Sequence, residues 1–147
     1  MIAWRISRFE DLRGLGGIRA RGRWHNAGQP IVYLADHAAS AMLEMLVHSE
    51  FAVLPNTFTL LKVDIPDGLV QALDPAQLSA DWRDDQEQTR ALGDAWLAQA
   101  PGAVLRVPSA LAVEGWNYLL NPVHPDAAAC KILAAIQAPL DPRFRPG

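Results

Sequence analysis

Three side chains that could act together on a charged substrate lie close in the sequence: Arg23, Tyr33 and Glu44. Arg23 ends a glycine-rich segment, Tyr33 is central in a short apolar run, and Glu44 lies in the apolar segment that follows. A guanidinium group binds phosphate or carboxylate oxygens through its planar fork, and a carboxylate stabilises positive charge that develops in a transition state. Because the connecting segments are short, we expect the three side chains to converge on one cavity.

Glu44 belongs to a polar stripe on an otherwise apolar segment. The members of the stripe recur at spacings of three or four residues and are His37, Ser40, Glu44 and His48. This spacing predicts a helix over residues 37–49 that is buried on most sides, with the stripe on one narrow face. Periodicity alone favours a stripe that faces solvent, whereas the nearness of Arg23 and Tyr33 favours one that faces a cleft. Each of these side chains also has an ordinary structural explanation, so both interpretations stay open.

A second group of polar residues lies between positions 108 and 125. Ser109 follows a proline at the end of an expected strand. Asn121 and His124 lie in a proline-containing turn, which can present an amide and an imidazole. Asparagine side chains in turns also commonly bond to their own backbone, and this alternative stays open for Asn121.

The composition fits one soluble globular domain spanning residues 1–147. Half of the residues are hydrophobic, a fifth are charged, and no apolar run reaches the length of a bilayer-spanning helix. The net charge of -3 argues against a general nucleic-acid binder. The single cysteine, Cys130, is expected to be a small buried apolar residue, and it fits a reducing compartment such as the cytoplasm.

Positive charge is concentrated at the start of the chain. Six of the eleven arginines lie there: Arg5, Arg8, Arg13, Arg19, Arg21 and Arg23. Guanidinium groups hold phosphate oxygens through a planar fork, and only two lysines occur in the chain, so a phosphorylated small molecule is one interpretation. A solvated arginine face that keeps the protein soluble is equally consistent with the composition.

The motifs of several enzyme classes are absent from the sequence. The histidines show no metal-ligand spacing, and no G-x-S-x-G surrounds a serine. The GLGG at 14–17 lacks both the lysine of a phosphate-binding loop and the spacing of a dinucleotide-binding one. We therefore expect no metal site, and a serine hydrolase is disfavoured.

The elements that would position the candidate residues are mostly strands. Strands or extended segments are expected at 2–7, 31–35, 57–65, 69–73, 103–109 and 115–121. Helices are expected at 37–49 and 83–100, with a helical turn opened by Pro125. Asp36 is the expected N-cap of the first helix, residues 13–30 are expected to form a loop, and residues 130–136 to complete the core. Strands outnumber helices and do not alternate with them regularly, so the predicted fold class is α+β.

Two segments of the chain resemble the RES-domain proteins, the toxins of bacterial RES–Xre toxin–antitoxin pairs. They read RGRWHNAGQPIVYLADHAASAMLEMLVH and PSALAVEGWNYLLNPVHP. The resemblance extends from WRI at 4–6 to DPRF at 141–144, so we expect one RES domain. The family loop usually reads Gly-Gly-Arg-Trp-Asn, whereas this chain reads Arg21-Gly22-Arg23-Trp24-His25.

The resemblance implies a set of site residues. Arg23, Glu44 and Ser109 match the trio that gives the family its name, and Tyr33 matches its accompanying tyrosine. In the implied roles, Glu44 stabilises a cation-like ribose, and Arg23 with Arg5 grips a pyrophosphate. The other implied substrate-binding residues lie on the nicotinamide and ribose side or at the rim: Trp24, Tyr33, Ser109, Asn121 and His124.

The resemblance also implies the fold, the reaction and the partners. The fold would be a single compact domain similar to the ADP-ribosyltransferases, and the substrate would be NAD⁺, which is cleaved between nicotinamide and ribose without a further cofactor. Water, phosphate or a protein side chain could accept the ADP-ribose, so a mono-ADP-ribosyltransferase that modifies a host protein is an alternative. A non-catalytic protein-binding module is a further one.

The implied partner is an Xre-type helix-turn-helix antitoxin protein. The toxin itself would contact neither nucleic acid nor membrane, would act in the cytoplasm, and would form either a homodimer or a hetero-oligomer with the antitoxin.

Overall fold

A computed structural model describes residues 1–47 and 54–145 of the chain. Its centre is a seven-stranded sheet in the order β4-β5-β6-β2-β1-β3-β7, in which only the β4–β5 pair is parallel. The strands are β1 (Ile2–Ile6), β2 (Val32–Ala35), β3 (Thr57–Asp64), β4 (Val70–Ala72), β5 (Val104–Pro108), β6 (Trp116–Leu120) and β7 (Lys131–Pro139). The helices are α1 (Gly16–Arg19), α2 (Ala38–Val47) and α3 (Gln86–Gln99). Short 3-10 turns are η2 (Asp67–Leu69), η3 (Pro75–Gln77), η4 (Pro125–Ala129) and η5 (Pro142–Phe144).

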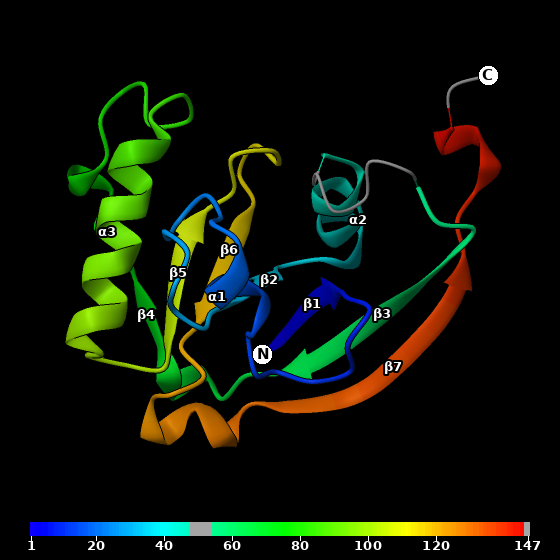
Figure 1. The fold of residues 1–147 in the computed structure, drawn as a ribbon, viewed down its shortest axis with the longest axis horizontal. Coiled ribbons are helices and arrows are strands. Elements are labelled where there is room, and N and C mark those ends of the chain that lie inside the picture. Colours follow the sequence, from blue (N-terminus) through cyan, green and yellow to red (C-terminus); the bar gives the residue numbers. More distant parts are fainter. Residues whose placement is uncertain (48–53, 146–147) are drawn as a thin grey trace.

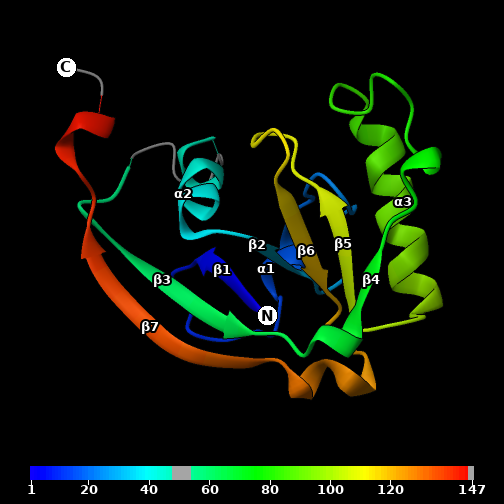
Figure 2. The same cartoon turned by 180° about the vertical axis from the view of Figure 1, so that it is seen from behind.

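The helices attach to different parts of the sheet. Helix α3 lies beside β4 and β5, and α2 lies beyond the ends of β1 and β2 (Figures 1 and 2). The connection between β5 and β6 projects toward the same end of the molecule as α2, whereas η4 lies at the opposite end (Figure 1). The two ends of β6 therefore face different surroundings.

Side-chain alternation along β2 divides the core into two clusters. Val32 and Leu34 pack in one cluster with residues of β1, β3 and β6, and Tyr33 packs in the other. The second cluster contains Trp24 from the loop before β2 and Trp96 from α3. The loop that carries Arg23 is therefore enclosed between α3 and the sheet, because its tryptophan is part of the core.

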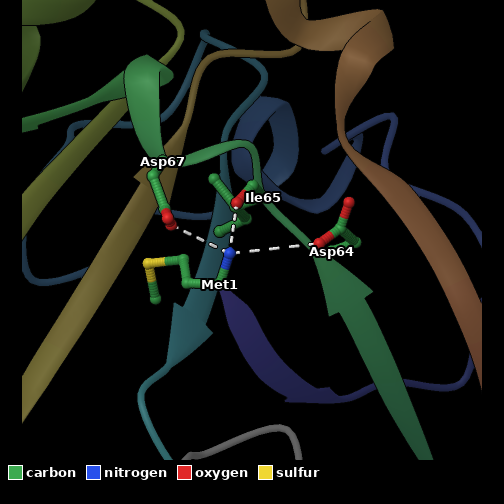
Figure 3. Close-up of polar contacts among 4 residues, drawn as sticks. All are labelled: Met1, Asp64, Ile65 and Asp67. Carbon is green, nitrogen blue, oxygen red and sulfur yellow. Dashed lines mark hydrogen bonds and ion pairs between the residues drawn. The ribbon is translucent and has the colours of Figure 1, made fainter.

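The first strand is fixed at its beginning as well as along its edges. The amino group of Met1 donates a hydrogen bond of 2.7 Å to the carbonyl of Ile65 and one of 3.0 Å to the carboxylate of Asp67 (Figure 3). Asp64 lies 3.9 Å from the same nitrogen. These contacts join the start of β1 to the end of β3.

The predicted fold class and most predicted elements are confirmed. The chain is an α+β domain, and each of the six predicted strands or extended segments contains an observed strand. The predicted helix at 83–100 is α3. One turn of helix, α1, lies inside the segment 13–30 that was expected to be a loop.

The prediction that Asp36 caps the first long helix is wrong. Its Oδ2 instead accepts a hydrogen bond of 3.0 Å from the backbone amide of Trp116. His37 fills the capping position, because its carbonyl accepts from the amide of Ala41 and its Nδ1 accepts from the amide of Ala39. Asp36 therefore joins α2 to β6 and leaves the start of the helix to its neighbour.

The prediction that this helix is buried on most sides is also wrong. Ala41 and Met45 are buried, but Leu43 and Val47 are exposed, because α2 contacts the sheet along one face only. The end of the predicted helix beyond residue 47, including His48, lies outside the described residues.

The segment 130–136 is less buried than predicted. Cys130 is buried and unpaired, as expected, but the segment then forms the edge strand β7, which pairs only with β3. Leu133 and Ile136 are exposed on this strand. Within the described residues, no helix is long and apolar enough to cross a membrane.

Candidate active site

Helix α3 holds the loop that carries Arg23. The hydroxyl of Thr89 donates a hydrogen bond of 2.6 Å to the carbonyl of Arg23, and Nε of Arg90 donates one of 2.9 Å to the carbonyl of Gly22. Gly93 lies so close to the Trp24 carbonyl oxygen that a side chain at this position would overlap it. The backbone on both sides of Arg23 is therefore fixed by one helix.

Arg23 is partly buried, and within the described residues its guanidinium makes one hydrogen bond. Its Nη1 donates a bond of 3.0 Å to the carbonyl of Arg83, at the approach to α3. Burial raises the pKa of both Glu44 and Tyr33, and the positive charge of Arg23 opposes that rise at both groups. Arg23 therefore lies near both of the residues with which it was predicted to converge.

Glu44 is half-buried on α2 and faces two partners from other segments. Burial raises the pKa of its carboxyl group, and the nearby Arg23 charge and a hydrogen bond from the Asn117 side chain oppose this effect. Burial dominates, so the carboxylate is more costly to ionise here than in water. Of the two interpretations of the polar stripe, the structure therefore supports a carboxylate withdrawn from solvent at Glu44.

Tyr33 lies on β2 with its hydroxyl fully engaged by the protein. The oxygen accepts a hydrogen bond of 3.1 Å from the amide of Trp24, and it lies 2.7 Å from Nδ1 of His25. Burial is the main cause that raises the pKa of the phenol far above its ordinary value. Tyr33 is therefore un-ionised at neutral pH, and the predicted bond from its hydroxyl to a ribose has no free donor.

Ser109 lies at the end of β5, on the side of the molecule that carries Glu44. Ser109 is 3% exposed, and its Oγ accepts hydrogen bonds of 3.2 Å and 2.9 Å from the amides of Leu111 and Ala112. Val107, two residues earlier, pairs directly with Asn117, so Ser109 is a near neighbour of the residue that binds Glu44. The serine thus shapes the turn after β5.

Arg5 approaches the site from the neighbouring strand. Its Nη1 donates a hydrogen bond of 3.0 Å to the backbone carbonyl of Tyr33. The β1–β2 ladder contains the single register pair Trp4 and Ala35, so the guanidinium bonds to β2 where the two strands separate. Hydrogen bonds from Arg13 are the main cause that lowers the pKa of Asp11, and the charge of Arg5 adds to this effect.

Three of the predicted substrate contacts are not supported by their positions. Trp24 is 1% exposed and packs at 6.1 Å between ring centroids against Trp82, so its ring is core and cannot cover a ligand. Asn121 and His124 lie beyond the other end of β6. Asn121 is four residues from Asn117, which along a strand is about 13 Å. They are too far from Glu44 to form its rim.

The local contacts of these two residues explain the wrong prediction. The side chain of Asn121 accepts from the amide of Val123, and Nδ1 of His124 accepts from the amide of Asp126. Both are turn and cap contacts, and for Asn121 this is the alternative that the sequence had left open.

Two residues of the site were not predicted. Asn117 was not among the predicted site residues, but its Nδ2 donates to the Leu34 carbonyl at 3.3 Å, and its side chain also acts to lower the pKa of Glu44. His25 was noted only as a departure from the family loop, and it is 1% exposed against Tyr33. The signal for Asn117 was its place inside an apolar strand, where a polar side chain needs a partner. Among the described residues, no group of histidine, cysteine or acidic side chains has the arrangement of a metal site.

Comparison with known proteins identifies the family of this chain. A family model described as the RES domain matches residues 2–141. The chain belongs to the RES-domain family. The curated protein Toxin Res of Pseudomonas putida is 47% identical to this chain over 134 residues, which cover 90% of this chain and 92% of that protein. The Prs ADP-ribosylating toxin of a Sphingobium strain is 34% identical over 153 residues, which cover 96% and 94% of the two chains.

A solved structure shares the fold. A chain of the crystal structure of the M. tuberculosis MbcT–MbcA toxin–antitoxin complex superposes with a TM-score of 0.72 and 20% identity, covering 94% of this chain and 84% of that one. The predicted RES membership and the predicted fold are therefore confirmed. The RES-domain chain is a homologue of proteins named as toxins.

Proposed function

We propose that this protein is the toxin of a toxin–antitoxin pair and that it consumes NAD⁺ by cleaving the bond between nicotinamide and ribose. Family membership supports the toxin role, since the curated relatives carry that name. The observation that carries the chemical proposal is the half-buried Glu44 carboxylate, with the Arg23 guanidinium and the Asn117 amide beside it.

Glu44 has the properties that this cleavage requires. When the bond between the ribose C1′ and the nicotinamide nitrogen breaks, the electron pair leaves with nicotinamide, which departs neutral, and the ribose is left with oxocarbenium character. A carboxylate partly withdrawn from water stabilises such a cation more strongly than a solvated one does. In this proposal Asn117 holds the Glu44 carboxylate in its ionised form and fixes its direction.

Arg23 supplies the complementary charge for the rest of the substrate. A partly buried guanidinium bonded through one nitrogen to a backbone carbonyl can exchange that carbonyl for the pyrophosphate of NAD⁺. Arg5 adds a second positive charge beside β2, and the half-buried ring of Tyr33 offers a packing surface. Ser109 contributes through the turn it shapes beside Asn117.

The acceptor of the ADP-ribose defines two candidate reactions. Capture of the ribose cation by water gives ADP-ribose and a proton, and capture by phosphate gives ADP-ribose phosphate. Capture by a protein nucleophile gives a mono-ADP-ribosylated host protein, and the name of the Sphingobium relative, an ADP-ribosylating toxin, supports this second candidate. Both reactions share the first bond cleavage and the same residues.

The proposed partner is an antitoxin protein of the Xre helix-turn-helix type. The solved structure with the same fold is a toxin–antitoxin complex, which supports an antitoxin for this chain as well. We propose that the pair acts in the cytoplasm, where the NAD⁺ pool of a bacterium is found, and that the toxin needs no further cofactor.

Expression in bacteria with measurement of the NAD⁺ pool tests the proposal. The wild type should deplete NAD⁺ and arrest growth, and the Glu44→Gln variant should do neither. Unchanged NAD⁺ with normal growth on expression of folded wild type would remove the proposal. Incubation with labelled NAD⁺ and lysate distinguishes transfer to protein from transfer to water or phosphate, because a discrete labelled protein band indicates transfer to protein.

A silent protein-binding module is the remaining alternative. Calorimetry with ADP-ribose distinguishes it from an enzyme. The proposal predicts binding that is lost in Arg23→Ala, whereas a binding module would show no heat with either protein.

A further inference from the structure

His25 has both of its ring nitrogens bonded inside the protein. Nε2 lies 3.0 Å from the carbonyl oxygen of Gly17, and Nδ1 lies 2.7 Å from the hydroxyl of Tyr33 and 3.2 Å from the amide of Gly22. A carbonyl oxygen can only accept a hydrogen bond, so Nε2 carries the proton. The amide of Gly22 donates to the backbone carbonyl of His25 at 3.1 Å and also points at Nδ1 at 3.2 Å, which fits Nδ1 as the ring nitrogen that accepts.

The same reasoning fixes the direction of the bond between His25 and Tyr33. The phenol oxygen already accepts from the amide of Trp24, and its single proton is free to be donated. Because Nδ1 of His25 has no proton, the Tyr33 hydroxyl donates to it. The chain of bonds runs in one direction, from the Trp24 amide through the Tyr33 hydroxyl to Nδ1 of His25, while Nε2 donates to the carbonyl of Gly17.

Two glycines make room for this arrangement. A side-chain carbon at Gly22 would lie 2.5 Å from the Tyr33 hydroxyl oxygen and 3.1 Å from Nδ1 of His25. One at Gly17 would lie 2.6 Å from the carbonyl oxygen of Gln29 and 3.1 Å from Nε2 of His25. The glycines therefore let the loop backbone close around the imidazole and phenol.

The chain of bonds encloses Arg23. The amides of Gly22 and Trp24, on either side of Arg23, both bond to the His25–Tyr33 pair. Helix α3 holds the same backbone from its other side. His25 is 1% exposed, so it can influence a ligand only through the residues it holds.

We infer that His25, with Nδ1 accepting from Tyr33 and Nε2 donating to Gly17, is a positioning residue that fixes Arg23 for NAD⁺ by holding its flanking backbone together with Tyr33. This inference rests on the proposed function, because it assigns to Arg23 the pyrophosphate of NAD⁺. It predicts that disturbing His25 weakens substrate binding and leaves the chemical step at Glu44 largely intact.

Three substitutions separate the two nitrogens of His25. In His25→Asn the amide oxygen takes the place of Nδ1, so the acceptor for Tyr33 and Gly22 remains and the bond to Gly17 is lost. In His25→Gln the side-chain end reaches the place of Nε2, so the bond to Gly17 remains and the acceptor for Tyr33 is lost. Tyr33→Phe removes only the hydroxyl and keeps the ring, so it leaves the packing of the core unchanged.

The experiment measures KM and kcat for nicotinamide release by these variants and by the double variant His25→Gln/Tyr33→Phe. We expect His25→Gln and Tyr33→Phe each to raise KM about tenfold, the loss of one directional bond, with kcat within about twofold. The double variant should be no worse than either single one, because both remove the same bond. His25→Asn should restore KM to within about threefold of wild type. Arg143→Gln, which removes only an exposed ion pair with Asp141, is the control for handling.

A second measurement identifies which idea fails. The ¹⁵N NMR spectrum of His25 in the free protein should show a protonated Nε2 and a bare Nδ1, and the Nδ1 signal should shift in Tyr33→Phe. Wild-type KM in His25→Gln, additive effects in the double variant, or a proton on Nδ1 would each overturn the positioning role alone. A wild type with the expected tautomer that neither binds ADP-ribose nor releases nicotinamide would overturn the proposed function and the positioning role with it.

Discussion

The two ends of β6 carry the same residue type in two different uses. Asn117, near its beginning, bonds to the Leu34 carbonyl and to Glu44, both far away in the sequence. Asn121, just after its end, accepts from the amide of Val123, two residues further on. This local bond fixes a turn through the amide oxygen of Asn121, whose buried Nδ2 has no hydrogen-bond partner among the described residues. Long-range bonds hold a charged group that the protein has partly withdrawn from water, and that end of the strand is the site.

Of the changes at the end of β6 that carries the site, Glu44→Gln should have the largest effect. It keeps the shape of the side chain and removes the negative charge, so nicotinamide release should fall about 10²- to 10³-fold, the effect of removing one preorganised electrostatic contact. Turnover of NAD⁺ by the purified protein measures the loss. The same change at an exposed position on α3, Glu87→Gln, is the matched control and should leave turnover unaltered. A fully active Glu44→Gln enzyme would refute the role of this carboxylate.

Arg23→Gln should have the next largest effect. A bond between charged groups is worth about 1.5–3 kcal/mol, so its loss should raise KM for NAD⁺ about 10- to 100-fold with a smaller change in kcat. Steady-state kinetics measure both constants. An unchanged KM would show that Arg23 does not contact the substrate and is an ordinary surface charge.

Gly93→Ala tests whether α3 positions the loop that carries Arg23. Alanine normally stabilises a helix relative to glycine, but here its side chain would overlap the Trp24 carbonyl oxygen. We expect a loss of about 1–3 kcal/mol in the free energy of unfolding, measured by urea denaturation, together with reduced activity.

The control is Gly68→Ala, where a side chain would meet open space and stability should change little. A Gly93→Ala protein as stable as wild type would show that α3 does not press on the loop.

Glu44→Gln should also stabilise the protein at neutral pH. Burial raises the pKa of this carboxyl, so its contribution to stability is present below the ordinary glutamate pKa and is lost as the pH rises through the folded-state value. The neutral glutamine avoids that loss. The gain should appear as a higher Tm of the variant in thermal unfolding at neutral pH. The gain should vanish at acidic pH, and a gain that is the same at every pH would exclude this cause.

The other end of β6 gives the smallest prediction. His124→Ala removes a cap from η4 and should cost up to about 1 kcal/mol of stability. KM and kcat for NAD⁺ should stay within about twofold of wild type. A large rise in KM would show that His124 belongs to the substrate site and that the two ends of β6 do not differ in function.

The sequence predicted the strands better than it predicted which polar residues would meet. Alternation located β3 and β5, because burial on a pleated surface leaves a pattern within one segment. The start of α2 was misplaced, because the Asp36 carboxylate bonds to Trp116, eighty residues away, and no local pattern records that partner.

The site residues were likewise predicted where they are close in the sequence and missed where their partners are distant. Arg23, Tyr33 and Glu44 were predicted together because short connections join them. Trp24 was assigned to the substrate along with Arg23, although its ring packs into a core completed by α3 much later in the chain. His25 and Asn117 were missed because their importance lies in partners that only the folded chain supplies.

The pH dependence of kcat/KM for nicotinamide release, compared between wild type and Arg23→Gln, tests the central claim most directly. If Glu44 must be ionised and lies beside Arg23, the acidic limb of the wild-type profile should fall above the ordinary glutamate range, because burial dominates its pKa. Removing the guanidinium should move that limb to still higher pH. A wild type that releases no nicotinamide, or an acidic limb that stays in place when Arg23 is replaced, would contradict the account.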